Sequence, residues 1–181
     1  MRAAGISRRA FCTGLLGTAA LLAAGRAAAV PLLPEQRQLS LEDAHTGERV
    51  DSVYWADGRY DPEALAALNR FFRCHYRDEV VAMDPGALDL LCDLWRSTGA
   101  DRRVRVISGY RSPAYNEQLR KRGRGVAKNS LHLEGKAIDF LIPGLSNRKL
   151  AQLARSLAAG GVGSYPTFVH IDTGPVRSWR G

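Results

Sequence analysis

Residues 130–139 read SLHLEGKAID and place the imidazole of His132 and the carboxylate of Asp139 seven residues apart, with Gly135 between them. In one continuous helix these two side chains would stand about 10.5 Å apart along the axis, too far to share an ion easily. In one continuous strand an odd spacing would put them on opposite faces. A turn at residues 134–135 can instead fold His132 back over a strand, residues 136–142, that carries Asp139. The stretch therefore predicts a turn and a strand that bring an imidazole and a carboxylate together.

A second stretch, residues 168–172, reads FVHID. It predicts a strand over residues 166–172, on which His170 and Asp172 share one face while the residues between them face the core. Together the two stretches supply two histidines and one carboxylate from adjacent elements, which is the ligand set of a catalytic zinc that keeps a fourth position for water. Such a zinc lowers the pKa of its bound water toward neutrality and so creates a nucleophile.

The same residues admit a second interpretation. His132 can be a loop histidine and His170 a satisfied core histidine, with Asp139 and Asp172 held in salt bridges. The spacing alone leaves both interpretations open, and the ligand set also admits first-row metal ions other than zinc.

The rest of the chain alternates between helices and short strands. Asp-Pro and Ser-Pro pairs mark helix starts, because an N-cap followed by proline at the first helical position is a start signal. We expect a hairpin over residues 39–55, helices over 62–75, 84–99, from 112 and from 146, a strand at 104–107, an extended leader at 30–38 and a basic tail from 175. This order predicts an α+β fold with helices packed on a small, mainly antiparallel sheet, in a single domain over residues 30–181.

The first 29 residues have the pattern of an export signal. Residues 7–11 read SRRAF, an uncharged apolar run follows at 12–25, and residues 27–29 are a small-residue cleavage site. The paired arginines fit the twin-arginine type, and the run is too short to span a membrane. The alternative is an amphipathic first helix. We expect a mature protein from about residue 30, in the periplasm and with no stable membrane span.

The net charge of +8 does not indicate a nucleic-acid partner. Four of the 26 basic residues lie in the first 29 residues, which leaves 22 against 18 acidic residues in the remainder. The one basic cluster, residues 120–122 with Arg124 and Lys128, has no aromatic residues between its charges. We expect it to lie against a polyanionic cell wall or to be a solvated face.

Two cysteines, Cys74 and Cys92, remain after the signal. Both fall in segments that read as neighbouring helices. A disulfide and two buried free thiols are both open, because sequence does not supply the Cα separation that decides between them.

The motif SxHxxGxAxD at residues 130–139, preceded by SGYRS at 108–112 and followed by a strand with HxD at 170–172, resembles the zinc D-alanyl-D-alanine metallopeptidase superfamily. This group includes VanX-type dipeptidases, zinc carboxypeptidases and peptidoglycan endopeptidases, and it shares its fold with the zinc domain of hedgehog proteins. From residue 39 onward the chain is more closely similar to its exported murein endopeptidases of the K type.

The resemblance implies a role for each matching residue. It makes His132, Asp139 and His170 the zinc ligands. Arg111 would hold a substrate carboxylate or the developing oxyanion, as its guanidinium fork suits. The resemblance further implies that Ser130 and Asp172 orient the ligands and that Tyr110 lines the substrate cleft.

The chain departs from the superfamily pattern at the general base. Other members carry a glutamate three residues before the last histidine or a histidine two residues before it, and here these positions are Thr167 and Phe168. Asp172 is our candidate base, because it shares a strand face with His170, and Glu134 is a second candidate.

We therefore expect an exported, zinc-dependent peptidoglycan endopeptidase that hydrolyses amide bonds in cross-linked stem peptides. Its expected partners are peptidoglycan peptides, with no nucleic acid, and its expected state is a monomer. The alternatives are a D-alanyl-D-alanine carboxypeptidase of the same superfamily and a non-catalytic cell-wall binding module with a structural zinc.

Overall fold

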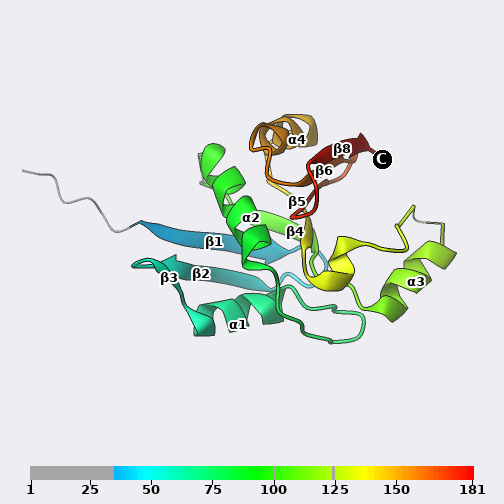
Figure 1. The fold of residues 1–181 in the computed structure, drawn as a ribbon, viewed down its shortest axis with the longest axis horizontal. Coiled ribbons are helices and arrows are strands. Elements are labelled where there is room, and N and C mark those ends of the chain that lie inside the picture. Colours follow the sequence, from blue (N-terminus) through cyan, green and yellow to red (C-terminus); the bar gives the residue numbers. More distant parts are fainter. Residues whose placement is uncertain (1–34, 100, 124) are drawn as a thin grey trace, which may run out of the picture. The chain divides into compact units, whose positions relative to one another are not determined.

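A mixed eight-stranded sheet, in the order β3-β2-β1-β4-β5-β7-β6-β8, runs through the part of the chain that this computed structural model describes, residues 35–99, 101–123 and 125–181 (Figure 1). The strands are β1 (Gln36–Asp43), β2 (Arg49–Ala56), β3 (Arg59–Tyr60), β4 (Val104–Ser108), β5 (Ala137–Leu141), β6 (Gly161–Ser164), β7 (Val169–Asp172) and β8 (Arg177–Arg180). Only the pairs β1–β4 and β6–β8 are parallel. The expected α+β class is confirmed, although the sheet is larger than expected. The predicted export signal lies outside the described residues.

The helices begin where the sequence predicted. They are α1 (Pro62–Phe71), α2 (Pro85–Ser97), α3 (Pro113–Lys121) and α4 (Asn147–Ser156), with a 3₁₀ helix, η1 (Leu131–Glu134). Asp61, Asp84, Ser112 and Ser146 each accept a hydrogen bond from a backbone N–H of the first turn. These caps satisfy amide groups that have no partner inside the helix.

Helix α1 ends at Phe71, earlier than expected, because the chain turns back on itself directly afterwards. The backbone N–H of Cys74 donates to the carbonyl of Glu79 (2.9 Å), which closes the turn. His75 therefore lies outside the helix, with its Nε2 3.2 Å from the carboxylate of Asp43.

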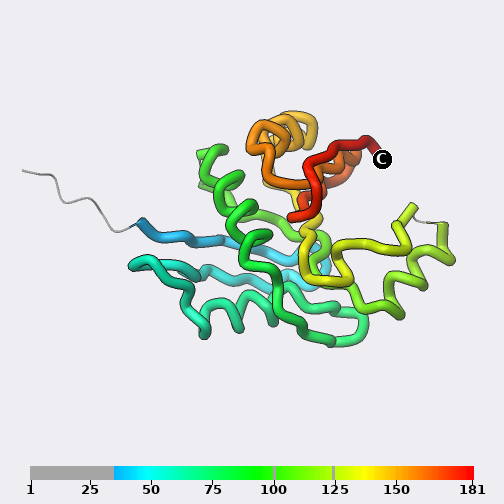
Figure 2. Tube along the Cα trace, in the orientation of Figure 1, coloured from blue at the N-terminus to red at the C-terminus, as the bar shows by residue number. Residues whose placement is uncertain are grey.

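Three helices cover the sheet. Helix α1 packs on β2, α2 packs on β1 and β7, and α4 packs on β6 and β7. Figures 1 and 2 show α3 apart from these three helices, and Asn116 is the one buried residue of α3. The core contains side chains from both halves of the sheet, among them Leu41, Tyr54, Phe140 and Ile171. One continuous core thus holds β5 and β7, the two strands that carry the predicted ligands, in the middle of the sheet.

Two strands near the end of the chain were not predicted. The sequence indicated one strand after the fourth helix and then a basic tail, whereas β6 and β8 also join the sheet. Strand β6 lacks an apolar run because Gly161 lies against the carboxylate of Asp172 and Gly163 against the indole of Trp179, where a Cβ would come within 2.5 and 2.8 Å of those side chains. The glycines allow a close approach that no hydrophobic pattern reveals.

The two cysteines are free and buried. The Sγ of Cys74 is 3.5 Å from the hydroxyl of Ser112, and the Sγ of Cys92 is 3.4 Å from the carbonyl of Gln38. Cys74 lies after α1 rather than in it, so the two thiols do not face each other from neighbouring helices. Of the two alternatives, the structure has the free thiols.

Among the described residues, no helix combines the length and the apolar character that crossing a membrane requires.

Gly135 gives a test of the turn on which the candidate site depends. Its φ is +67°, and a Cβ there would lie 2.7 Å from the carbonyl oxygen of Ala82. We expect Gly135→Ala to lower the free energy of unfolding by about 2–4 kcal/mol, from left-handed backbone strain and this collision together. Gly58 is the matched control, with φ +79° and no atom near the added Cβ. Chemical denaturation of Gly58→Ala should show a loss of only about 1 kcal/mol, and equal losses in the two variants would contradict the account.

Candidate metal centre

Three elements bring the predicted ligands together. Asp139 on β5 lies directly opposite His170 on β7 in the antiparallel register. His132 comes from η1, which ends at Gly135 in the left-handed conformation, and the N–H of Lys136 donates back to the carbonyl of Leu131 (3.0 Å). The turn predicted at residues 134–135 is thus present, and it folds His132 over the strand that carries Asp139.

One atom of each residue points to a common centre. His132 Nε2 and His170 Nδ1 are 3.2 Å apart, and Asp139 Oδ1 is 3.2 Å from the first and 2.7 Å from the second. Ligands about 2.0–2.1 Å from a tetrahedral zinc stand roughly 3.3 Å from one another, because the tetrahedral edge is about 1.6 times the bond length. Two of the three separations are close to that spacing, while the one between Asp139 and His170 is shorter. All three residues are buried, and the donor set fits a zinc ion.

The other polar atom of each candidate ligand is held by a partner. His132 donates from Nδ1 to the carbonyl of Gly109 (2.6 Å), which leaves the lone pair on Nε2. His170 donates from Nε2 to Asp172 Oδ2 (2.9 Å), and Asp139 Oδ2 accepts from Arg111 Nη2. Such outer hydrogen bonds fix the tautomer and the ring orientation of metal-binding histidines.

Burial and neighbouring charges favour the ligand form of His132 and Asp139, and they act in the opposite direction on His170. Burial lowers the pKa of His132 and so favours its neutral form. Burial alone would raise the pKa of Asp139, but His132, His170 and Arg111 outweigh it and hold this pKa well below its usual range. For His170 burial acts to lower the pKa, and the hydrogen bonds to Asp139 and Asp172 outweigh it and raise the pKa. Opposite charges next to the pocket thus keep Asp139 ionised.

Arg111 lies directly beside the candidate ligands. Its Nε donates to the hydroxyl of Ser108 (2.9 Å), and its backbone N–H donates to the carbonyl of His132 (3.0 Å). Together with the bond from Nη2 to Asp139, these contacts fix the guanidinium at the end of β4. Only 12% of the Arg111 side chain is exposed, and this side chain lines two cavities that adjoin the candidate ligands.

Asp172 is completely buried, and both of its oxygens are occupied. Oδ1 accepts from the backbone N–H groups of Gly161 (3.1 Å) and Gly174 (2.9 Å) and from Arg177 Nη1 (2.9 Å). Oδ2 accepts from His170 and from Arg177 Nη2 (2.7 Å). Burial alone would raise the pKa of Asp172, but these hydrogen bonds outweigh it and lower the pKa.

Sequence reasoning missed Arg177 and Trp179, which it assigned to a basic tail. Arg177 binds Asp172, and the ring of Trp179 lies 5.2 Å from the ring of His170. The only sequence pattern that could have indicated strand β8 was the alternation of Arg177 and Trp179. The segment is too short and too charged for this alternation to predict a strand beside the candidate metal site.

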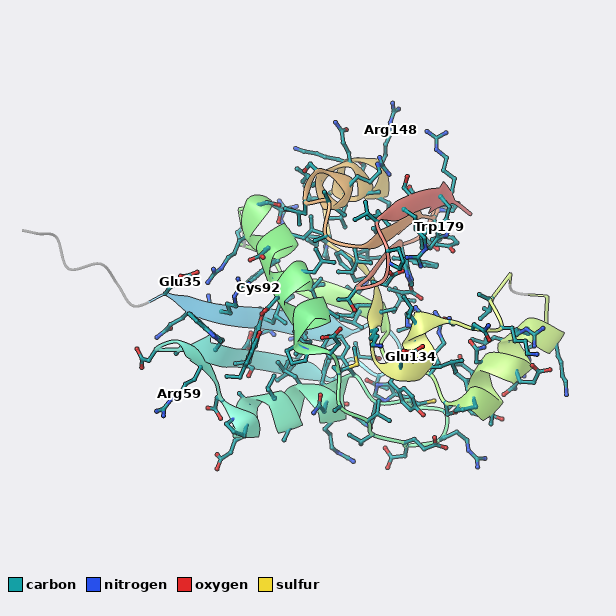
Figure 3. All side chains as sticks on the ribbon, viewed as in Figure 1. Glu35, Arg59, Cys92, Glu134, Arg148 and Trp179 are labelled. Carbon is teal, nitrogen blue, oxygen red and sulfur yellow. The ribbon has the colours of Figure 1, made fainter. Side chains whose placement is uncertain are left out.

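The remaining predicted residues are not next to the three ligand atoms. Ser130 lines the same cavity as the three candidate ligands, but its side chain makes no capping hydrogen bond on η1. Tyr110 does not line that cavity and lies instead along a neighbouring, larger one. Glu134 is 56% exposed on η1 and pairs with Lys136. Figure 3 labels Glu134 on η1 and Trp179 on β8, the elements on either side of this region.

Two cavities meet beside Asp139. One, of about 330 Å³, contains the three ligand residues together with Arg177 and Trp179. The other, of about 640 Å³, extends toward α3 and the turn after α1. They share the lining residues Arg111, Val126, Asp139, Tyr165 and Phe168. The space beside the ligands therefore continues in two directions.

Two histidines and an aspartate with their outer atoms held, beside open space, define the class of mononuclear metal-dependent hydrolases. The family model described as peptidoglycan L,D-endopeptidase MepK matches residues 32–179. The chain belongs to this family, which lies within the superfamily that the sequence motifs resembled. The expected enzyme class, a metallopeptidase, is confirmed with it.

Two relatives agree with the family match. Peptidoglycan L,D-endopeptidase MepK of Escherichia coli (strain K12) is 47% identical over 149 residues, which are 81% of each chain. A probable peptidoglycan L,D-endopeptidase MepK of Haemophilus influenzae is 40% identical over 151 residues, 82% of this chain and 81% of the relative. The crystal structure of Serratia marcescens L-Ala D-Glu endopeptidase ChiX aligns with a TM-score of 0.37 and 18% identity, over 52% of this chain and 68% of that one.

Zinc binding gives a direct test of the three ligands. Zn²⁺ at a hundredfold excess over its dissociation constant should stabilise the protein by about 2.7 kcal/mol, or about 5–10 °C in Tm for a domain of this size. We expect His170→Ala to abolish this increase, as measured by circular dichroism during heating. The control is His45→Ala, because His45 lies outside the ligand set and is 3.1 Å from the carbonyl of Ile107. The same increase in all three proteins would contradict the ligand assignment.

Proposed function

We propose that this protein is a zinc-dependent endopeptidase that hydrolyses L,D-amide bonds between cross-linked peptidoglycan stem peptides. The observation that carries the proposal is the convergence of His132 Nε2, Asp139 Oδ1 and His170 Nδ1 in the smaller cavity, which joins the larger one beside Asp139. The L,D-endopeptidase names of relatives that are 40–47% identical support the choice of bond.

In this proposal His132, Asp139 and His170 hold the metal. When bound, zinc supplies Lewis-acid chemistry, which activates water and polarises the scissile carbonyl. The protein's own contribution is to keep the ligands buried, to hold Asp139 ionised and to fix the orientation of the three side chains through Gly109, Asp172 and Arg111.

The two cavities favour an endopeptidase over a carboxypeptidase. A carboxypeptidase needs a pocket that ends in a cation at the substrate's free carboxylate, whereas an endopeptidase must accommodate peptide on both sides of the cleaved bond. Space here continues from Arg111 and Asp139 in two directions. The smaller cavity can take one branch of the cross-link, and the larger one, toward the stacked rings of Tyr76 and Tyr115, the other.

Arg111 is the proposed catalytic cation. Its Nε and Nη2 are used by Ser108 and Asp139, and its side chain lines both cavities where they join. A guanidinium in that position can donate to the oxygen of the scissile amide as negative charge develops on it, or to a carboxylate beside it. Since the group is fixed before substrate arrives, little reorganisation accompanies the reaction.

Asp172 had two expected roles, general base and orienting group, and its surroundings favour the second. A base must reach a proton, but both oxygens of Asp172 already accept hydrogen bonds and the side chain is fully buried. We therefore assign Asp172 the role of holding His170 in its orientation. Glu134, which is exposed and paired with Lys136 outside both cavities, has no contact that favours it as the base.

The proposed substrate lies outside the cytoplasmic membrane, so the proposal includes export to the periplasm by the twin-arginine signal at residues 1–29. The basic cluster, which begins in the last turn of α3, would favour the anionic wall. Within it Arg120 also pairs with Glu117 (2.6 Å), and Arg124 lies outside the described residues.

Digestion of defined cross-linked muropeptides tests the proposal. We expect the full chain with one Zn²⁺ to convert L,D-cross-linked dimers to monomers and to leave D,D-cross-linked dimers intact, with products separated by chromatography. Removal of the metal by a chelator, or His170→Ala, should abolish digestion, and added Zn²⁺ should restore it only in the unaltered chain. Release of free D-alanine alone would indicate a carboxypeptidase, and zinc binding without turnover would indicate a binding module.

A further inference from the structure

Arg177 makes a two-pronged contact with a buried carboxylate. At the start of β8, its Nη1 donates to Asp172 Oδ1 (2.9 Å) and its Nη2 donates to Asp172 Oδ2 (2.7 Å). Asp172 is completely buried, while 43% of the Arg177 side chain is exposed. The guanidinium is therefore the charge that compensates Asp172 at the boundary between the protein interior and the smaller cavity.

The contact continues to the candidate metal ligand. Asp172 Oδ2 also accepts from His170 Nε2, and the opposite ring nitrogen of His170 is one of the three converging atoms. A second route runs through Trp179, because the guanidinium carbon of Arg177 lies 5.0 Å from the centre of the indole ring and that ring lies 5.2 Å from the ring of His170. Arg177 is thus connected to the same imidazole by hydrogen bonds and by ring packing.

We propose that Arg177 is a positioning residue that holds Asp172 in the orientation in which it fixes His170, and so raises the affinity of the site for Zn²⁺. Arg111 has the corresponding role toward Asp139. Its Nη2 donates to Asp139 Oδ2, the oxygen that does not belong to the three converging atoms. The inference rests on the proposed metal site but not on the peptidase activity. Outer-shell partners of this kind contribute about 10- to 100-fold in metal affinity.

Strand β8 has contacts other than this guanidinium that hold it in the sheet. Strand β8 is joined to β6 by a parallel backbone ladder over residues 177–180, and Trp179 packs on Gly163 and donates from its indole N–H to the hydroxyl of Tyr165 (3.0 Å). Arg180, an exposed arginine on the same strand, is the matched control, because none of its side-chain atoms contacts Asp172 or His170 among the described hydrogen bonds and ion pairs.

The experiment measures zinc affinity in the full chain, by competition with a chromophoric chelator, for Arg177→Ala, Arg177→Lys and Arg180→Ala. We expect Arg177→Ala to weaken the affinity about 10- to 100-fold. Arg177→Lys should recover part of it, because an ammonium keeps the charge but cannot donate to both oxygens in the fork geometry. Arg180→Ala should stay within about twofold of the unaltered chain.

An affinity of Arg177→Ala within about twofold of the unaltered protein, with near-ultraviolet circular dichroism unchanged, would overturn the proposal. If Arg177→Ala does not fold, Asp172→Asn gives the second measurement, since it keeps the side-chain shape and removes the charge. It should weaken zinc binding at least as much, and unchanged affinity would overturn the proposal equally. Absence of zinc binding in the unaltered chain would overturn the metal site itself and this role of Arg177 with it, whereas loss of digestion alone would concern only the peptidase.

Discussion

The pairing of Asp139 with His170 across β5 and β7 is the constraint on which the candidate site depends. Side chains alternate between the two faces of a strand, so a slip of one residue in this register would move one ligand to the opposite face. The register is held from both sides, because β4 pairs with β5 and β6 pairs with β7. With two ligand atoms fixed by the sheet, only His132 has to be brought in, and the left-handed turn at Gly135 does so.

The charges around the site form two matched pairs. Arg111 compensates Asp139, and Arg177 compensates Asp172. A buried carboxylate without a partner would become protonated and would lose its value as a ligand or as an acceptor for histidine. Asp139 Oδ1 remains directed at the candidate metal centre, and Asp172 Oδ2 accepts from His170 as well as from Arg177. The two guanidiniums thus make it possible to bury the donor set beside cavities that can hold a peptide.

The sequence predicted the helix starts and the turn that brings His132 to Asp139 because these depend on local rules. Asp61, Asp84 and Ser112 are followed by proline, and the position of Gly135 between His132 and Asp139 required a turn. The contacts of Arg177 with Asp172 were harder to predict, because Arg177 lies on strand β8, which sequence reasoning took for a tail. Strand β6 was missed because its glycines reflect the close approach of Asp172 and Trp179, not a hydrophobic pattern. Both errors concern side-chain contacts between strands of the sheet, which a hydrophobic pattern along one strand does not reveal.

The coordination of zinc distinguishes the proposed ligands from any other residues that could hold the metal. X-ray absorption spectroscopy of the zinc-loaded chain reports the ligand atoms and their distances without reference to activity. With His132, Asp139 and His170 as ligands we expect nitrogen and oxygen atoms at about 2.0–2.2 Å, with the scattering signature of two imidazole rings. A sulfur shell at about 2.3 Å, or a shell without imidazole, would contradict this ligand assignment, because Cys74, Cys92 or surface carboxylates would then hold the metal in place of His132, Asp139 and His170.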